Sequence, residues 1–275
     1  MRIPIGDWIE AIVEFLLANF EFFFDAVSSG LGSLAGGLEG FLKGVPYPIL
    51  IIALAGLGWW LAKRSVGIMT ALGLLLIVNL GLWDETMESL TLVIVATLIA
   101  IVIGLPLGIL AAKKRTVQII MKPLLDLMQT LPAFVYLIPA LMFFGLGRVP
   151  GIVATVIFAM PPAIRLTALG INQVPRELIE AADAFGATPG QKLYKVELPM
   201  ALPTIMAGVN QAIMLSLSMV VISAMIGAQG LGAQVLRGIS RLDIGLGFES
   251  GLAVVILAMT LDRITQSLGQ NKIKD

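Results

Sequence analysis

Long apolar segments alternate with short polar ones through most of the chain, and this pattern predicts helices that cross a membrane. Seven segments approach the roughly 20 apolar residues that a membrane-crossing helix needs. They are residues 47–62, 66–82, 90–112, 131–144, 149–169, 203–227 and 251–266. The first, second and fourth are short. We therefore expect an all-α membrane protein with about seven transmembrane helices.

Prolines interrupt several of these segments. They are Pro106, Pro132, Pro139, Pro161 and Pro162. A proline removes a backbone hydrogen bond, and in a membrane the freed carbonyl group is tolerated only where protein or water satisfies it. We expect the interruptions to face the protein interior, toward a pathway.

The N-terminal residues 1–27 have a different pattern, with acids on one helical face and aromatic residues on the other. The acids are Asp7, Glu10, Glu14, Glu21 and Asp25. Acids in hydrocarbon are costly, and a signal peptide has a basic start and no acids. We predict an amphipathic interfacial helix held by its aromatic face, with a helix packed against the rest of the protein as the alternative. Residues 28–45, rich in glycine and small residues, are predicted to be a linker, with a loose re-entry into the membrane as the alternative.

A polar island at residues 177–199 separates two apolar blocks and predicts a helix, a turn and a second helix. Apolar residues recur at the spacing of one helical face, at Leu178, Ala181, Ala182 and Phe185. Glu177, Glu180 and Asp183 fall on the opposite face.

The turn of this island has its own signals. Gly186 is suited to a left-handed C-terminal cap, because glycine has no Cβ. Thr188, Pro189 and Gln191 then supply an N-cap, a first-turn proline and a capping-box partner for the second helix. Pro199 is expected to break the helical pattern before the next apolar block.

The island resembles the EAA loop in permease subunits of ABC importers. The resemblance rests on Glu180, Ala181, Ala182, Gly186, Leu198 and Pro199 at their spacing, and Val196 replaces a more usual isoleucine. Residues 124–147, the pair Pro161 and Pro162 with Arg165, and residues 226–235 are similar to permeases of quaternary-amine importers of the glycine betaine and proline betaine type. The resemblance implies a type I importer permease fold over residues 46–270.

The resemblance also implies partners. The six island residues just named would couple the chain to an ATPase subunit, with Glu180 facing a basic group and Gly186 setting the hairpin's shape. Two copies of the chain would form the pathway, two ATPase subunits would bind ATP and Mg on the cytoplasmic side, and an external receptor would deliver the substrate. The location implied is the plasma membrane of a bacterium or archaeon.

Composition agrees with a membrane protein and excludes several activities. Hydrophobic residues make up 58% and charged residues 13%, with a mean hydropathy of +0.96, against about 25% charged in a typical soluble domain. Cysteine and histidine are absent, and the spans hold no carboxylate cluster, so there is no candidate catalytic or metal-binding site. No phosphate-binding loop is present, so ATP must bind elsewhere. The glycine pairs Gly104/Gly108 and Gly230/Gly232 are expected to serve close helix packing.

A secondary transporter and a membrane enzyme are the alternatives to an importer permease. A secondary transporter would need ionisable residues at mid-membrane and inverted repeats, and a membrane enzyme would need acid, base or metal-binding residues. The sequence offers almost none of either. We expect a transport subunit rather than an enzyme, with no nucleic-acid partner and membrane lipid as its surroundings.

Basic residues set the orientation, because they collect on the cytoplasmic side. In a seven-span count the basic clusters fall on one side of the membrane. They are Lys63 with Arg64, the cluster at 113–115, the basic residues Arg165, Arg176, Lys192 and Lys195 around the island, and the basic tail at 271–275. The exceptions are Arg2, Lys43, Arg148, Arg237 and Arg241. We expect the N-terminus outside and the hairpin and C-terminus in the cytoplasm.

Neutral polar and aromatic residues are the candidates for the substrate pathway. They are Gln129, Thr130, Phe134, Tyr136, Asn210, Gln211, Ser216 and Ser218. Phe143 and Phe144 offer further ring faces to a quaternary ammonium group. The alternative is that such residues hold helices together. The expected cargo is glycine betaine or a related compatible solute; choline, carnitine and an amino acid remain alternatives.

Overall fold

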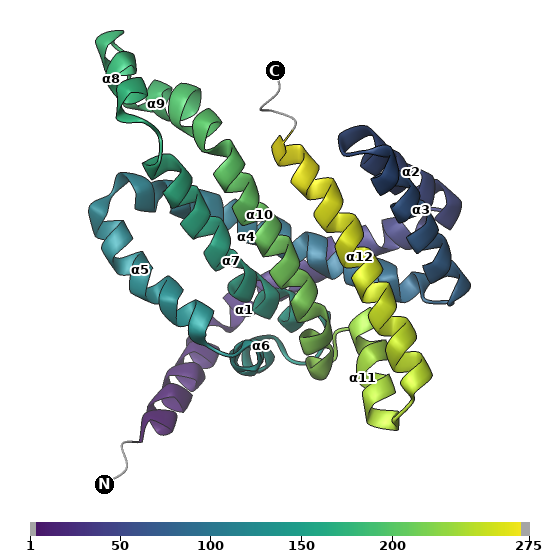
Figure 1. The fold of residues 1–275 in the computed structure, drawn as a ribbon. Helices are drawn as coiled ribbons and strands as arrows, with labels where there is room; N and C mark the ends of the chain where they lie inside the picture. Colours follow the sequence, from purple (N-terminus) through teal and green to yellow (C-terminus); the bar gives the residue numbers. More distant parts are fainter. Residues whose placement is uncertain (1–3, 271–275) are drawn as a thin grey trace.

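The structure is a computed structural model that describes residues 4–270, and these residues form helices joined by short connections, with no strand (Figure 1). The first elements are α1 (Ile5–Gly44), α2 (Tyr47–Leu61), α3 (Arg64–Asn79), α4 (Trp83–Lys113), α5 (Arg115–Thr130), η1 (Ala133–Tyr136), α6 (Leu137–Phe144) and α7 (Arg148–Asn172). The remaining ones are α8 (Arg176–Ala184), α9 (Pro189–Lys192), η2 (Leu193–Glu197), α10 (Leu198–Ser223), η3 (Ala224–Ile226), α11 (Leu231–Arg241) and α12 (Ile244–Gln270). The predicted all-α class is confirmed.

Four helical segments of the described chain are long and apolar enough to cross a membrane alone: residues 83–113, 148–172, 189–226 and 244–267. Two bent pairs, α1 with α2 and α5 with α6, raise the number to as many as six if each pair is one span. The 16-residue α3 is a shorter apolar helix. The seven segments predicted to span lie largely on helix, although residues 80–82 and 131–132 do not. By length and composition, the described chain supports at most six spans rather than about seven.

Glycines let α4, α7 and α10 pack closely, as expected for membrane helices. A Cβ on Gly108 would lie 2.7 Å from the carbonyl oxygen of Ile164, and one on Gly208 would lie 3.1 Å from that of Pro162. Gly104 likewise faces Ala163 of α7. The packing role predicted for Gly104 and Gly108 is confirmed, and α7 lies between α4 and α10 as the centre of the bundle.

The chain bends sharply at Pro132, where the helix direction changes by 108° between α5 and the segment that contains α6. The sequence analysis placed a span at residues 131–144 and missed α5, which is a regular helix with Pro123 inside it. Pro106, Pro161 and Pro162 stay within the continuous helices α4 and α7. Of these prolines, only Pro132 marks a break between helices.

The predicted linker at residues 28–45 is wrong, because α1 runs unbroken as helix to Gly44 apart from a kink at Phe20. Leu31, Ala35, Leu38 and Leu42 recur at helical spacing and pack against the apolar core. This stripe fixes the segment as helix despite its glycines, whose low helix propensity costs about 1 kcal/mol each relative to alanine. The first half of α1 extends away from the bundle (Figure 1).

The two ends of the molecule carry different elements. The hairpin of α8 and α9 projects from one end, and the C-terminal part of α12 points to the same end (Figure 1). The beginning of α1, together with α6 and α11, lies toward the opposite end (Figure 1). α2 and α3 form a short helical hairpin that packs beside α12.

Candidate functional sites

The polar island folds as the predicted helical hairpin. α8 ends at Ala184, and Gly186 takes φ +73°, the left-handed conformation that favours glycine. The capping box then starts α9: the Thr188 N–H donates to Gln191 Oε1 at 2.8 Å, and the Gln191 N–H donates to Thr188 Oγ1 at 3.3 Å. An ion pair of 2.6 Å between Lys192 and Asp183 joins the two arms.

The surface of the hairpin is open to a partner. No residue of α8 is buried, and the side chains of Phe185 and Tyr194 are 92% and 73% exposed. Exposed aromatic residues of this kind are typical of protein interfaces. The predicted apolar face is also largely exposed, so most of α8 is free to meet a partner apart from the Asp183–Lys192 ion pair.

The predicted coupling residues lie in two groups. Glu180, Ala181 and Ala182 share α8 with Gly186 just beyond its end, whereas Leu198 and Pro199 begin α10. The expectation that Pro199 breaks the helix is wrong. α9, η2 and α10 run on as one helical segment from Pro189 to Ile226. The five-residue π-helical turn η2 precedes Pro199, so the missing N–H falls in the first turn of α10, where proline is tolerated.

The sequence analysis missed Glu197, which lies at the base of the hairpin. This residue is only 3% exposed, and its carboxylate forms an ion pair with Lys113, the last residue of α4. A glutamate between the apolar residues Val196 and Leu198 was a signal of a buried charge, but the EAA-loop pattern specifies no residue type at this position.

The pathway candidates near the bend are mostly exposed. Gln129, Thr130 and Phe134 are exposed, while Tyr136 is buried and its hydroxyl donates to the carbonyl oxygen of Met128. The Tyr136 ring meets Phe158 edge to face.

The further aromatic candidates are occupied by packing. Phe143 stacks on Phe24 of α1 with ring centroids 4.5 Å apart, and Phe144 meets the same ring edge to face. These two rings therefore join α6 to α1.

The candidates on α10 divide between packing and exposure. Ser216 is buried, accepts from Thr97 Oγ1 at 3.0 Å and donates to the Ala212 carbonyl oxygen, so it holds α10 to α4. Gln211 and Ser218 are exposed. Whether any of these residues contacts cargo stays a prediction.

Asn210 belongs to a polar cluster that the sequence analysis did not foresee. Its amide donates to Asp262 Oδ1 at 3.0 Å, and Gln266 donates to the same oxygen at 2.7 Å. Thr265 donates to the Asn210 amide oxygen at 2.9 Å. This cluster holds a carboxylate inside the span α12 and ties that helix to α10.

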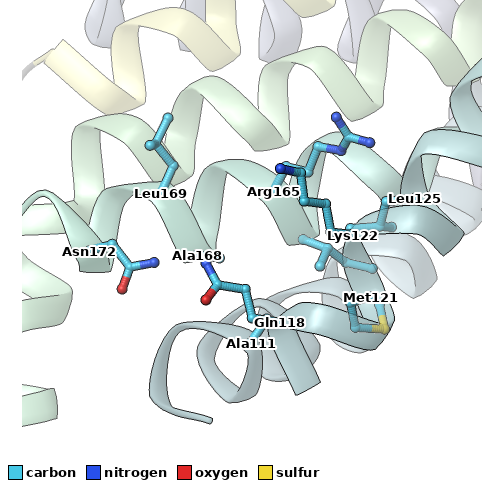
Figure 2. A pocket seen from close by; sticks show the side chains of 10 residues that line it. Ala111, Gln118, Met121, Lys122, Leu125, Arg165, Ala168, Leu169 and Asn172 are labelled. Carbon is cyan, nitrogen blue, oxygen red and sulfur yellow. The ribbon is translucent and has the colours of Figure 1, made fainter. Parts of the chain in front are cut away.

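A pocket of about 250 Å³ lies between α5, α7 and the end of α4 (Figure 2). Its lining residues are Ala111, Gln118, Met121, Lys122, Leu125, Ile164, Arg165, Ala168, Leu169 and Asn172. Arg165 pairs with Asp126 of α5, so the span holds this cation with a counter-charge.

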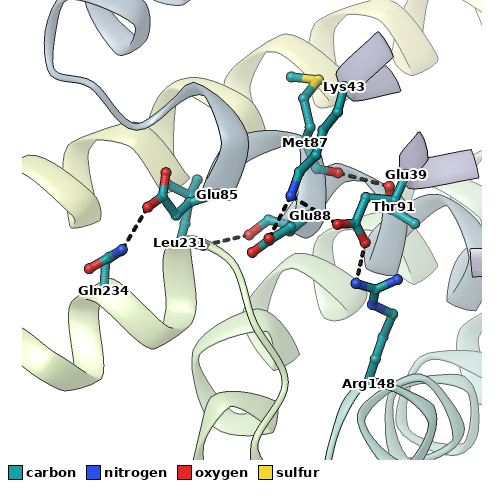
Figure 3. A network of polar contacts seen from close by, with 10 residues as sticks. Glu39, Lys43, Glu85, Met87, Glu88, Thr91, Arg148, Leu231 and Gln234 are labelled. Atoms are coloured by element: carbon teal, nitrogen blue, oxygen red, sulfur yellow. Dashed lines mark hydrogen bonds and ion pairs between the residues drawn. The ribbon is translucent and has the colours of Figure 1, made fainter. Parts of the chain in front are cut away.

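A charge network joins α1, α4 and α7 (Figure 3). Lys43 lies 2.9 Å from Glu39 and 2.7 Å from Glu88, and Arg148 pairs with the second oxygen of Glu39. Two cations that were exceptions to the predicted orientation are therefore neutralised by acids of the same region.

Two further hydrogen bonds join α4 to α11. Glu85 accepts from Gln234 at 2.7 Å, and the Leu231 N–H donates to Ser89 Oγ at 2.8 Å (Figure 3).

Comparison with known proteins gives consistent matches. Residues 104–271 match the family described as binding-protein-dependent transport system inner membrane component. The chain is 52% identical to the glycine betaine transport system permease protein OpuAB of Bacillus subtilis, over 98% of this chain and 96% of that protein. It is 50% identical to the glycine betaine/proline betaine transport system permease protein ProW of Escherichia coli, over 98% of this chain and 76% of that protein.

The bundle is also similar to a solved structure of the MetNI methionine ABC transporter in an inward-facing conformation. The TM-score is 0.58 at 26% identity, covering 70% of this chain and 94% of that chain.

Proposed function

This chain belongs to the family of binding-protein-dependent transport system inner membrane components, and from this premise we propose that it imports glycine betaine or a related quaternary amine as the permease of an ATP-driven importer. The expected type I permease fold is confirmed by the likeness to the MetNI transporter. The chain is a multi-pass membrane protein and a transport subunit rather than an enzyme.

The observation that carries the substrate class is the identity of 52% over nearly the whole of both this chain and OpuAB. A relative of equal identity is named for glycine betaine and carnitine, and one at 36% is named for trimethylamine N-oxide. These three solutes share a nitrogen that carries three methyl groups. The relative named for choline is only 28% identical, over 66% of this chain, so choline is the weaker candidate.

The partners follow from the exposed hairpin and the family. One hairpin per chain, with Phe185 and Tyr194 exposed, supports docking of one ATPase subunit on each chain and a working unit with two copies. ATP and Mg would then bind in the ATPase subunits. The family's description as binding-protein-dependent supports an external receptor that captures cargo before it reaches this chain.

The orientation follows from the same end-to-end arrangement. The basic residues near the hairpin support a cytoplasmic position for α8 and α9, and the N-terminus then lies outside. Neutralisation of Lys43 and Arg148 by Glu39 and Glu88 removes an objection to this orientation. The membrane proposed is the plasma membrane.

The substrate class is tested with the complete complex of this chain, its ATPase subunit and its receptor in lipid vesicles. Glycine betaine, proline betaine, carnitine, choline and trimethylamine N-oxide are added in turn, with methionine as the control. We expect glycine betaine to stimulate ATP hydrolysis and methionine to have no effect. Stimulation by methionine, with none by any of the five methylated solutes, would contradict the assignment.

A further inference from the structure

The base of the coupling hairpin holds an ion pair between two distant parts of the chain, a buried glutamate and a lysine whose side chain is 39% exposed. Glu197 ends the π-helical turn η2, and its side chain is 5% exposed. Lys113 ends α4, and its ammonium pairs with Glu197 Oε2, which makes no hydrogen bond of ordinary geometry to a described residue. The charge of this carboxylate is therefore balanced by Lys113.

The surroundings of the pair are apolar. One hydrophobic cluster contains the chain neighbours of both residues. It includes Ala112 before Lys113, Leu193 and Leu198 on either side of Glu197, and also Ile171 and Ala201. A carboxylate among such residues is tolerated when a counter-charge meets it, and removal of one partner leaves an uncompensated charge. Lys113 also lies at the C-terminus of a helix, where a cation is favoured.

The pair lies between the hairpin and two further elements, α10 and α5. On one side, η2 continues directly into α10, so a displacement of α9 passes along that helix. On the other side, Lys113 is separated from the start of α5 only by the extended residue Lys114. α5 leads to the bend at Pro132, beside Gln129 and Thr130.

The π-helical turn strengthens this interpretation. Such turns are rare, and they occur frequently at functional sites. Here the turn lies between the hairpin and the membrane helix, and it ends at the buried residue Glu197.

We infer that the Lys113–Glu197 pair is a second link that carries movement of the docking hairpin to the joint of α4 and α5, beside the direct connection through α10. Both are positioning residues: they touch neither cargo nor nucleotide. This inference rests on the proposed function, since it assumes that an ATPase subunit moves the hairpin.

The test counts cargo molecules imported per ATP hydrolysed by the complete complex in vesicles. Glu197→Gln and Lys113→Met should lower this ratio at least tenfold while the ATPase subunit stays bound. The conservative Lys113→Arg should stay within twofold of the native ratio. The matched control is Lys114→Met, because Lys114 is exposed and forms no ion pair with a residue in the described range 4–270.

A double variant separates coupling from simple stability. Lys113→Met with Glu197→Met removes both charges, so no carboxylate is left without a counter-charge at the buried position of Glu197. We expect normal assembly and a ratio still at least tenfold low. A ratio restored to within twofold of the native value would overturn the inference, as would loss of the ATPase subunit from this variant or an unchanged ratio in Glu197→Gln.

A second measurement does not depend on transport. Because the chain has no cysteine, spin labels can be attached to two introduced cysteines, which replace the exposed residues Thr116 on α5 and Ala184 on α8. The link predicts a narrow distance distribution in the native chain and in Lys114→Met, and a broad one in Glu197→Gln. An unchanged width in Glu197→Gln contradicts the link. Absence of ATP-driven import by the native complex would instead contradict the proposed function.

Discussion

Replacement of Gly186 by valine tests the role of the hairpin most specifically. The residue has φ +73°, and no atom lies within 4 Å of the place a Cβ would occupy. A larger side chain therefore meets open space, and the cost of the substitution comes from the backbone. A left-handed conformation costs an L-residue roughly 1–2 kcal/mol, and a β-branched residue more.

The interactions that hold this turn are of the same size. The capping box between Thr188 and Gln191 contributes about 1 kcal/mol, and the partly exposed ion pair of Lys192 with Asp183 contributes about 0–1 kcal/mol. A penalty of about 1–2 kcal/mol shifts a local equilibrium by roughly 5–30-fold. We therefore expect Gly186→Val to displace the hairpin without unfolding the bundle, which has separate apolar contacts.

The assay is ATP-driven uptake at matched expression, with membrane insertion and bound ATPase subunit measured in the same preparation. Uptake should fall in the order asparagine, alanine, valine at position 186, because asparagine tolerates the left-handed region. Gly186→Val should abolish uptake with insertion near normal. Gly190→Ala is the control, since Gly190 lies in α9 and also has open space around its Cβ position. Normal uptake by Gly186→Val, or equal damage by Gly190→Ala, would refute the reasoning.

Three further predictions address the partners and the orientation. Glu180→Lys should abolish uptake by placing like charge against a basic ATPase groove, and Glu180→Gln should retain part of it; normal uptake by Glu180→Lys would remove Glu180 from the interface. Single cysteines at Ser29 and Asn271 should react with an impermeant reagent from opposite sides, Ser29 from outside and Asn271 only after permeabilisation; reaction of both from one side contradicts the orientation. The active complex should contain two copies of this chain by mass measurement, and an active complex with one copy would refute the proposed stoichiometry.

The hairpin was predictable from the sequence because its signals are local. Thr188 and Gln191 are three residues apart, and Gly186 marks the turn by its lack of a Cβ. Neither signal depends on the rest of the fold, so the structure reproduces both. The long apolar spans were predictable for the same reason, since length and hydropathy are properties of the segment itself.

The second half of α1 shows where a local signal fails. The glycines of residues 28–44 indicated a linker, yet Leu31, Ala35, Leu38 and Leu42 form an apolar stripe that packs on the core. Tertiary packing outweighs low helix propensity here. The apolar stripe was visible in the sequence, but the stabilisation that it gives to the helix depends on the core surface against which it packs. The sequence did not reveal that surface.

The charges inside the bundle could not be assigned from the sequence, because their partners are distant in the chain. Asn210 and Asp262 are 52 residues apart, and Lys113 and Glu197 are brought together by the packing of α4 and α10 against α7. Spacing rules describe neighbours on one helix and say nothing about such pairs. The structure therefore adds both the α10–α12 cluster and the Lys113–Glu197 pair to the candidate residues.

Uptake of labelled glycine betaine into vesicles that contain the purified complex tests the central claim most directly. ATP is supplied on the side of the membrane that carries the ATPase subunits, and the receptor and the cargo are supplied on the opposite side. Uptake is measured in the presence and in the absence of a protonophore. We predict accumulation that requires ATP and the receptor and is unaffected by the protonophore, because ATP drives the proposed import and the sequence contains no histidine to relay protons. Accumulation without ATP, driven by an ion gradient and abolished by the protonophore, would contradict the account.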